Sequence, residues 1–493
     1  MKFKRASGIL LHPTCLPGPY GIGDLGPAAY AWVDWLAGSG CTLWQVLPLG
    51  PTGFGDSPYQ CFSAFAGNPY LVSPQLLLKQ GLLKDEDLAD MPAWDEQRVD
   101  FGRLYLWKPA LLEKAFRRFS ADPGAVQAEF ASFCTENAAW LEDYALFMAI
   151  KETHGGGSWD GWPKALRLRE PSALKEARAA LGSTIIRLSF YQFLFFRQWN
   201  ALRAYARKEG LQIIGDIPIF VAYDSSDVWG HPDLFHLDEN GKPTVVAGVP
   251  PDYFSPTGQL WGNPLYKWEV HRTSGYAWWL ARMQASLKLV DILRIDHFRG
   301  FAGYWEIPAG NPTAEIGRWV KGPGADFFKV VQDKMGSLPI VAEDLGVITP
   351  DVVRLRDQFN LPGMKILQFA FSGPDNPFLP HAYPQNCVVY TGTHDNDTTR
   401  GWYATAPEAE KDFARRYLQV DGNRIAWDLV RAAWSSAAVF ALAPLQDLLE
   451  LGNAARMNFP SHLGGNWEWR MSDRPLSTEL QSRIKELNWL YLR

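Results

Sequence analysis

The chain has 493 residues, of which 47% are hydrophobic and 20% charged, and its net charge is −5. This composition is typical of a globular protein with a sizeable core, and the lack of any long basic stretch excludes nucleic acid and anionic membranes as expected partners. Aromatic residues are abundant, with 22 Trp, 18 Tyr and 28 Phe. Most are expected in the core, but such an excess also suits a sugar-binding cleft.

The sequence predicts no membrane span, no signal peptide and no disulfide framework. Residues 185–199 are strongly apolar, but Arg187 and Arg197 interrupt them before the roughly 18 apolar residues that a span requires, so we expect a buried helix. Pro13 and Pro17 interrupt the apolar start of the chain before a signal-peptide core could form. The widely spaced cysteines favour reduced thiols in a cytoplasmic protein over disulfides or a structural zinc site; they are Cys15, Cys41, Cys61, Cys134 and Cys387.

Short apolar, β-branched runs recur along the whole chain and alternate with helical patterns, for example at 276–288 and 351–358. This alternation predicts a (β/α)8 barrel, an α/β fold of the TIM type. A barrel needs only about 250 residues, so large inserted subdomains are expected within a single catalytic unit, 1–493. The eight predicted strands are 8–13, 42–50, 211–221, 291–298, 338–346, 364–371, 387–395 and 438–449.

Two insertions are located by where the alternation stops. Residues 60–200, between the second and third strands, predict a mainly helical subdomain. Residues 222–270, between the third and fourth strands, are rich in Pro, Gly and Asp and predict a loop-rich insertion that carries a substrate lid. Within it, Asn240-Gly241 between strand-like flanks predicts a hairpin. The apolar spacing of 476–493 predicts the closing barrel helix, which leaves no room for a C-terminal β-domain.

Two motifs are better explained without a bound cofactor or metal. Residues 21–26 read GIGDLG, but no strand precedes them and no acidic residue follows about 20 positions later, so a tight loop is favoured over a dinucleotide site. His394, Asp395 and Asp397 suggest a metal site only weakly, because neighbouring residues on a strand point to opposite faces. We therefore expect no cofactor and no metal.

Three carboxylates, Asp296, Glu343 and Asp395, follow predicted strands. Any single one could be a helix N-cap, but barrel enzymes place catalytic residues at the carboxyl ends of their strands. Arg294 lies two residues before Asp296, so both side chains face the same way, and its guanidinium is expected to keep that carboxylate ionised. The three together predict acid/base and nucleophilic chemistry on a neutral, polar substrate.

The same residues carry a resemblance to a known family. RID at 294–296, VAED at 341–344 and THDND at 393–397 resemble the catalytic signatures of the α-amylase clan. The variants present here, and three further stretches, resemble the 4-α-glucanotransferases of glycoside hydrolase family 77, the amylomaltases or disproportionating enzymes. Those stretches are 56–71, 248–266 and 455–470.

The resemblance implies a role for each site residue. Asp296 would be the nucleophile, Glu343 the general acid/base and Asp395 the transition-state stabiliser of a retaining double displacement. Aromatic residues of a remote glucan-binding groove would be Phe54 and Phe101. The implied substrate-binding residues are Tyr59, which would stack on the sugar, with Ser57, Arg294, His394, Phe254, Gln259, Trp261 and Asn466.

The resemblance also implies the substrates. A segment of an α-1,4-glucan or maltooligosaccharide would pass to the 4-OH of another glucan or of glucose, so that maltooligosaccharides are disproportionated. Two alternatives remain open from the sequence: an α-glucan hydrolase of the same clan, and a non-catalytic glucan-binding protein. The segments 248–264 and 457–469 are expected to act as lids that favour a sugar over water as the acceptor.

Overall fold

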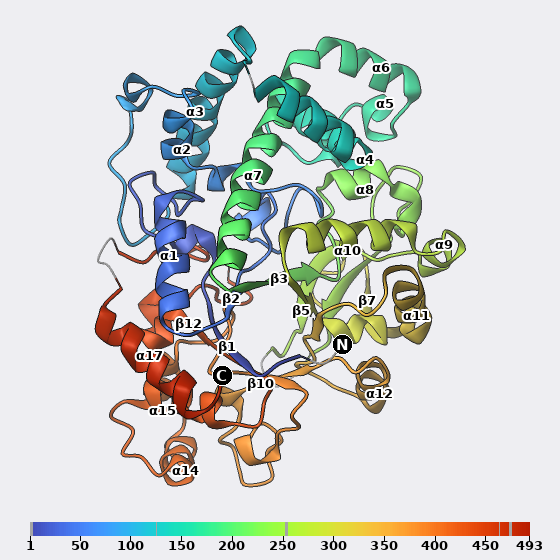
Figure 1. The fold of residues 1–493 in the computed structure, drawn as a ribbon. Helices are drawn as coiled ribbons and strands as arrows, with labels where there is room; N and C mark the ends of the chain where they lie inside the picture. Colours follow the sequence, from blue (N-terminus) through green and yellow to red (C-terminus); the bar gives the residue numbers. More distant parts are fainter. Residues whose placement is uncertain (1–2, 125, 252–254, 463, 473–475) are drawn as a thin grey trace.

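The computed structural model describes residues 3–124, 126–251, 255–462, 464–472 and 476–493. Its centre is an eight-stranded parallel sheet in the order β10-β11-β12-β1-β2-β3-β6-β9. The two outer strands approach each other, and the backbone N–H of Ala342 donates to Pro362 O at 2.9 Å, so the sheet forms a nearly closed barrel (Figure 1). The strands are β1 Ala6–Leu10, β2 Leu43–Gln45, β3 Gln212–Pro218, β6 Ile292–Asp296, β9 Ile340–Ala342, β10 Gly363–Ile366, β11 Cys387–Tyr390 and β12 Phe440–Pro444.

This architecture confirms the predicted (β/α)8 barrel, and each of the eight strands overlaps its predicted range. The strands are shorter than predicted because the polar residues that follow them form loops, as after Tyr390, where β11 ends five residues before Asp395. Alternate strand residues fill the barrel interior with a separate apolar cluster that includes Ile214, Ile292 and Val341. Residues two positions further along the same strands also face inward, so polar side chains as well as apolar ones project into the barrel interior.

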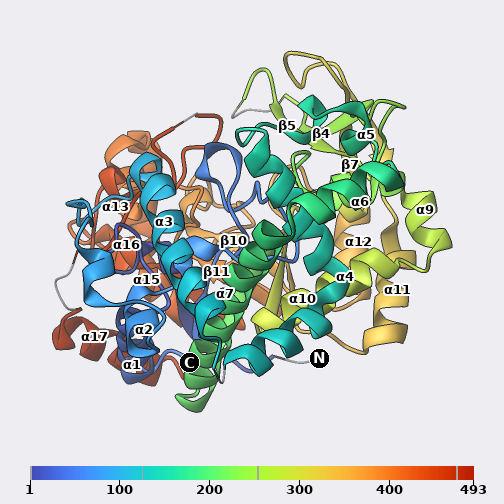
Figure 2. The same ribbon diagram turned by 90° about the horizontal axis from the view of Figure 1, so that it is seen from above.

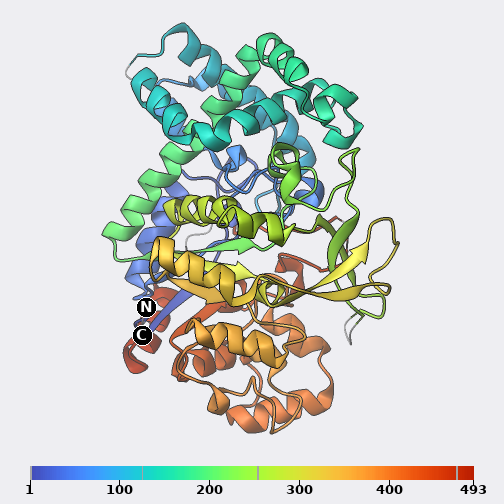
Figure 3. The same cartoon turned by 90° about the vertical axis from the view of Figure 1, so that its right-hand side faces the viewer.

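Helices surround the barrel, and both chain ends lie at the same end of it (Figures 1 and 3). The last helix, α17, packs against α1 and α15. The Arg493 guanidinium donates to the carbonyl oxygens of Ala6 and Ala438, each at 3.1 Å. It so ties the residues after α17 to β1 and to the segment before β12. The covering helices include α1 Pro27–Gly38, α10 Ala277–Leu289, α11 Gly324–Met335, α12 Pro350–Gln358, α15 Ile425–Ser435 and α17 Thr478–Leu490.

A group of helices lies between β2 and β3. The long helix α7 packs against α4 in this group and then leads into β3 as a barrel helix. In Figure 2, α7 crosses the view with α3 on one side and α5 and α6 on the other. Aromatic stacking fixes the group, as where the ring centroids of Phe119 and Phe190 lie 4.4 Å apart. The helices are α2 Pro74–Lys79, α3 Phe101–Ala121, α4 Val126–Thr153, α5 Lys164–Arg167, α6 Pro171–Ala180 and α7 Gly182–Lys208.

The apolar stretch 185–199 lies within helix α7 and most of it is buried, as predicted. Within the described residues, no single helix is long and apolar enough to cross a membrane. Helices α6 and α7 pass that test only as a pair, and they are bent by 79° relative to each other.

A second, antiparallel sheet of four strands stands at the end of the barrel away from the chain termini (Figure 3). Its order is β5-β4-β7-β8, and two of its strands come from the loop after β6, which the sequence did not predict. The predicted hairpin at Asn240-Gly241 is present as a turn with one bridge, Leu237 to Pro243, flanked by hydrogen bonds from Asp238 N–H to Lys242 O at 2.8 Å and from Thr244 N–H to His236 O at 3.0 Å. The strands are β4 Val245–Val249, β5 Gln259–Pro264, β7 Gly303–Pro308 and β8 Arg318–Lys321.

Candidate active site

Strand β6 delivers Arg294 and Asp296 to the inside of the barrel, on the same face as the buried Ile292. Arg294 is 4% exposed, and its Nη1 donates to Asp296 Oδ1 at 2.9 Å. The same nitrogen donates to Asp216 Oδ1 at 2.7 Å. The predicted contact between Arg294 and Asp296 is therefore present, but the guanidinium is shared between two carboxylates.

Asp216 is a site residue that the sequence reasoning missed. It lies on β3, in register with Arg294 on β6, and its side chain is fully buried. Its second oxygen accepts a hydrogen bond from the Tyr59 hydroxyl at 2.6 Å. A carboxylate inside the apolar run of residues 211–221 was the signal that could have found it. Asp216 thus connects Tyr59 to Arg294.

Glu343 follows β9 directly and lies beside Asp296. The pair Ile295–Ala342 is in register between β6 and β9, and Asp296 and Glu343 are the next residues on the two strands. Neighbouring strands are about 4.8 Å apart, which suits the roughly 5–5.5 Å between the carboxyl groups of retaining glycosidases. Backbone N–H groups hold both oxygens of Glu343, from His297 at 2.6 Å and from Leu345 at 2.8 Å.

The two neighbouring carboxyls differ in protonation. Burial, reinforced by the negative charge of Asp296, raises the pKa of Glu343 to about 8, and Arg294 and the two N–H donors only partly offset this. Burial also raises the pKa of Asp296, which Arg294 lowers and Asp216 raises. Arg294 therefore favours the ionised form of Asp296, as expected, but against burial and the charge of Asp216. Because the charge of Asp296 helps raise the pKa of Glu343, Asp296 ionises first and Glu343 keeps the proton.

Asp395 comes from the loop after β11 and is held by its neighbours. Its Oδ2 lies 3.2 Å from His394 Nε2, and its Oδ1 accepts from Asn458 Nδ2 at 2.7 Å. Burial opposes its ionisation, but the charge and hydrogen bond of His394, the Asn458 amide and Arg294 together lower its pKa to about 2. Asp395 is therefore a carboxylate at neutral pH.

Three rings pack beside these carboxylates. The centroids of Tyr59 and His394 lie 5.1 Å apart in nearly parallel planes, and Trp467 lies 5.9 Å from Tyr59 and 5.8 Å from His394. Trp467 has φ = 66°, a left-handed conformation that a bulky residue rarely adopts. The predicted Tyr59 and His394 are thus brought together, and Trp467 is a member of the cluster that the sequence reasoning did not name.

Two predicted substrate-binding residues hold their own loops. Asn466 is 8% exposed; its Oδ1 accepts from the Phe459 N–H at 2.8 Å and its Nδ2 donates to His462 O at 2.9 Å. Ser57 Oγ accepts from the Tyr59 N–H at 3.2 Å and so shapes the loop that presents that tyrosine.

The other predicted contacts come from β5 and the loop before it. Trp261 packs edge to face on His297, with ring centroids 4.8 Å apart, and its Nε1 donates to Gln259 Oε1 at 3.1 Å. His297 has φ = 49° and is the residue whose N–H holds Glu343. Trp261 and Gln259 therefore stand close to the residue that holds Glu343, whereas Phe254 lies outside the described residues.

Phe54 and Phe101 were expected to line a remote glucan-binding groove, and the structure describes the side chain of Phe101. Phe101 begins α3 and packs into the core against Tyr105, with ring centroids 5.8 Å apart. A ring that is 9% exposed offers little face to a sugar. The side chain of Phe54 lies outside the described part of the chain.

Comparison with known proteins agrees with this geometry. The family model for 4-alpha-glucanotransferase, glycoside hydrolase family 77, matches residues 11–477. The 4-alpha-glucanotransferase of Thermus thermophilus is 54% identical over 497 residues, which cover 99% of both chains. That of Synechocystis sp. is 50% identical over 496 residues, covering 99% of this chain and 98% of the relative.

Solved structures give the same result. The amylomaltase from Streptococcus agalactiae in complex with acarbose is 41% identical, with a TM-score of 0.97 over 99% of this chain and 100% of that one. The amylomaltase from Corynebacterium glutamicum is 18% identical, with a TM-score of 0.79 over 98% of this chain and 75% of that one, and shares the fold. The relatives favour the predicted transferase over the hydrolase and the non-catalytic glucan-binding protein. The chain belongs to the 4-alpha-glucanotransferase family, glycoside hydrolase family 77.

Proposed function

We propose that this 4-alpha-glucanotransferase works by a retaining double displacement with Asp296 as nucleophile, Glu343 as general acid/base and Asp395 as transition-state stabiliser. The observation that carries the proposal is the placement of Asp296 and Glu343 at the ends of neighbouring strands, where burial and the charge of Asp296 raise the pKa of Glu343 to about 8. Two carboxyls with different protonation at this spacing are what retention requires.

In the first step, Asp296 attacks C1 of the donor sugar while Glu343 gives its proton to the departing glycosidic oxygen. Its two backbone N–H contacts fix the direction of the carboxyl. Arg294 orients the nucleophile, and Asp216 orients Arg294 and Tyr59. The product is a glucosyl ester on Asp296, and Glu343 is left ionised.

Asp395 acts on the sugar ring in both steps. Held ionised by His394 and Asn458, it is placed to accept hydrogen bonds from sugar hydroxyls, which strengthen as the ring gains oxocarbenium character. The stacked rings of Tyr59 and His394 provide a flat face for the same sugar.

In the second step, the 4-OH of a second glucan or of glucose attacks C1 of the ester, Glu343 takes the proton of that hydroxyl, and Asp296 is released as a carboxylate. Water competes at about 55 M in bulk, so transfer needs an acceptor held at high effective molarity and a cleft that excludes water. Trp261 beside His297 supplies an apolar wall on the acid/base side. The acarbose complex of the S. agalactiae relative supports oligosaccharides as ligands of such a cleft.

The test is incubation with maltotriose, followed by product-length analysis and a count of reducing ends. We expect glucose and longer maltodextrins with almost no net gain in reducing ends. Asp296→Asn should abolish transfer and still bind maltotriose. Asp291 directly precedes β6, at the opposite end of the strand from Asp296, and Asp291→Asn should transfer normally. A steady rise in reducing ends, or transfer by Asp296→Asn, would contradict the proposal.

A further inference from the structure

His394 presents one ring nitrogen to the proposed active site and has the other buried behind it. Its Nε2 lies 3.2 Å from Asp395 Oδ2, and its ring stacks on that of Tyr59. Its Nδ1 is buried and has no hydrogen-bond partner among the residues that the structure describes. Since a buried polar atom without a partner costs free energy, the surroundings of Nδ1 are expected to supply one.

A second atom of this kind is Oε1 of Gln446, which is buried and has no partner within the described part of the chain. Gln446 lies on the short helix α16, Leu445–Leu448, which directly follows β12. Its Nε2 donates to Ala455 O at 3.2 Å. Because a carbonyl oxygen can only accept, this contact fixes the orientation of the amide and makes Oε1 the acceptor at the other side.

His394 and Gln446 line the same small cavity. It lies between the loop after β11 and the start of α16, and Leu10 and Met457 form apolar parts of its wall. The cavity has room for about one water molecule, and a buried water needs two or more polar partners. A nitrogen that donates and an oxygen that accepts are complementary partners for such a water.

The charged side chains that line the cavity are engaged elsewhere. Asp447 Oδ2 accepts from the hydroxyls of Thr391 at 2.6 Å and Thr399 at 2.7 Å. Asp397 pairs with Arg456. The contacts of Asp447 fix α16 against the loop that carries the histidine, so the neighbouring glutamine is held in place beside that loop.

The charge state of His394 decides what its Nδ1 can do. Burial opposes the imidazolium form, but the charge and hydrogen bond of Asp395 outweigh burial and raise the pKa of His394; Arg294 lowers this pKa and Asp216 raises it. His12, after β1, is a neutral neighbour because burial lowers its pKa to about 3. Both nitrogens of an imidazolium are donors, so Nδ1–H requires an acceptor.

We propose that Gln446 is a positioning residue that accepts the Nδ1–H hydrogen bond of His394 through a water molecule in this cavity. This rests on the proposed function, in which His394 and Asp395 contact the donor sugar. The partner of one imidazole nitrogen sets the orientation and protonation of the other. Gln446 therefore keeps Nε2–H directed at Asp395 and acts on the sugar only through these two side chains.

The test is a pH titration of the His394 ring by NMR in protein with 15N-labelled histidine, with the signals assigned by their loss in His394→Gln. Gln446→Leu removes the acceptor, so the titration midpoint should fall by about one pH unit, the effect of one hydrogen bond to a charged group. Gln446→Glu keeps an oxygen at this place and adds a negative charge, so the midpoint should rise. A purely structural role would not give opposite shifts.

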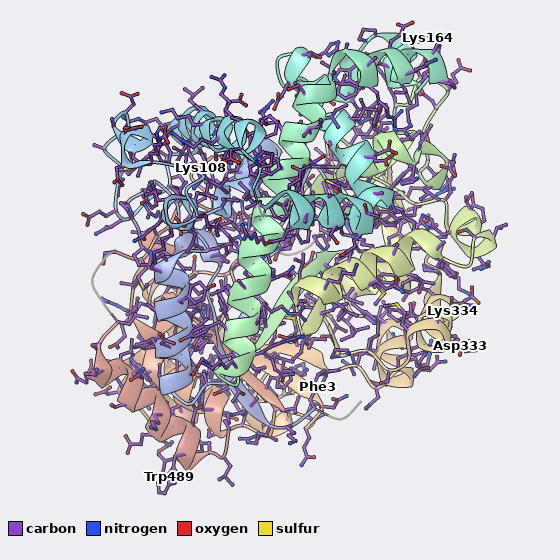
Figure 4. The ribbon with its side chains drawn as sticks, turned by 45° about the horizontal axis from the view of Figure 1, so that its top comes forward. Phe3, Lys108, Lys164, Asp333, Lys334 and Trp489 are labelled. Atoms are coloured by element: carbon purple, nitrogen blue, oxygen red, sulfur yellow. The ribbon has the colours of Figure 1, made fainter. Side chains whose placement is uncertain are left out.

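Kinetics of maltotriose disproportionation provide a second readout. Gln446→Leu should lower kcat about tenfold with KM changed less than about twofold, whereas Gln446→Glu should keep most of the rate. The matched control is Gln198→Leu. Gln198 is also buried and donates to a backbone carbonyl, Ser73 O at 3.3 Å, but it lies on α7, the long pale-green helix in Figure 4. The control should leave both the His394 titration and kcat unchanged.

An unmoved His394 midpoint in Gln446→Leu, or a shift in the same direction in both Gln446 variants, would overturn the inference. An equal shift in Gln198→Leu would overturn it as well. Should Gln446→Leu fail to fold, Gln446→Glu decides alone, since a lowered or unchanged midpoint contradicts the inference. None of these results touches the proposed function, which fails only if the wild-type protein does not transfer glucan from maltotriose.

Discussion

At the scale of single residues, the site depends on how one buried cation is shared. Arg294 Nη1 contacts Asp216 at 2.7 Å and Asp296 at 2.9 Å, while the donors to Glu343 within the described part of the chain are backbone N–H groups. Removing charges from water is expensive, so the carboxyl without its own cation keeps a proton. The roles that we propose for Asp296 and Glu343 follow from this unequal sharing.

The pH dependence of kcat/KM should show both groups. Glu343 must be protonated for the first step, so the rate should fall as pH rises through about 8. Asp296 must be ionised, and because its pKa is raised, the acid limb should lie above the pH at which an ordinary aspartate titrates. Initial rates of maltotriose disproportionation between pH 4 and pH 10 measure both limbs.

Asp216→Asn probes the acid limb of the same profile. The charge of Asp216 raises the pKa of Asp296, so its removal should move the acid limb to lower pH and leave the alkaline limb in place. Asp291→Asn is the control, because the Asp291 carboxylate is 7% exposed and also pairs with an arginine, Arg203, at 2.9 Å. An unmoved acid limb in Asp216→Asn would contradict the assigned network.

The three carboxyls that we propose as catalytic were singled out in the sequence because each follows a strand-like run and matches a family signature. Asp216 could not be singled out in the same way. Its function depends on Tyr59, which is 157 positions away in sequence, and on the register of β3 with β6. Contacts between distant loops are set by tertiary packing, which periodicity does not report.

At the scale of elements, the small sheet joins the barrel loops to the segment that the sequence predicts as a lid. Strand β5 carries Trp261 and is tied to the loop of Tyr59 by Gln60 Nε2, which donates to Asn263 Oδ1 at 3.3 Å. The sequence predicted a loop-rich lid here but not the sheet. Its strands come from both 222–270 and the loop after β6, and their pairing is long-range and antiparallel.

Trp261→Ala tests whether β5 selects the acceptor. Loss of the ring beside His297 should open the acid/base side to water, so that transfer falls by about tenfold and the share of hydrolysis rises. Glucose and reducing-end counts from maltotriose measure the two fates separately. Trp489→Ala, on α17, should leave both unchanged; an unaltered ratio in Trp261→Ala would assign acceptor selection to another segment.

At the scale of the whole molecule, the barrel is closed by contacts between segments that are far apart in sequence. Asn488 on α17 is buried; its Oδ1 accepts from the Ser7 hydroxyl at 2.5 Å and from Trp434 Nε1 at 2.7 Å. The fold class could be predicted from eight alternating runs, because each run is local. The contacts of Asn488 could not be predicted, because they join β1, α15 and α17, which are far apart in sequence, through individual polar side chains.

Arg493→Ala should therefore lower stability without changing the chemistry. The Arg493 guanidinium donates to several backbone carbonyls, including Trp434 O at 2.7 Å and Ala6 O at 3.1 Å, at the end of the barrel opposite the active site. Since hydrogen bonds to charged groups contribute about 1.5–3 kcal/mol each at most, a net loss of roughly 2 kcal/mol is expected once water replaces them. It should appear as a melting temperature lower by a few degrees and a shorter half-life at elevated temperature.

Lys485→Ala, at an exposed position of α17, is the control and should melt like the parent. Disproportionation of maltotriose at 25 °C should be the same in all three proteins; a lowered kcat in Arg493→Ala with an unchanged melting temperature would show that this end of the barrel acts on the site instead of on the fold.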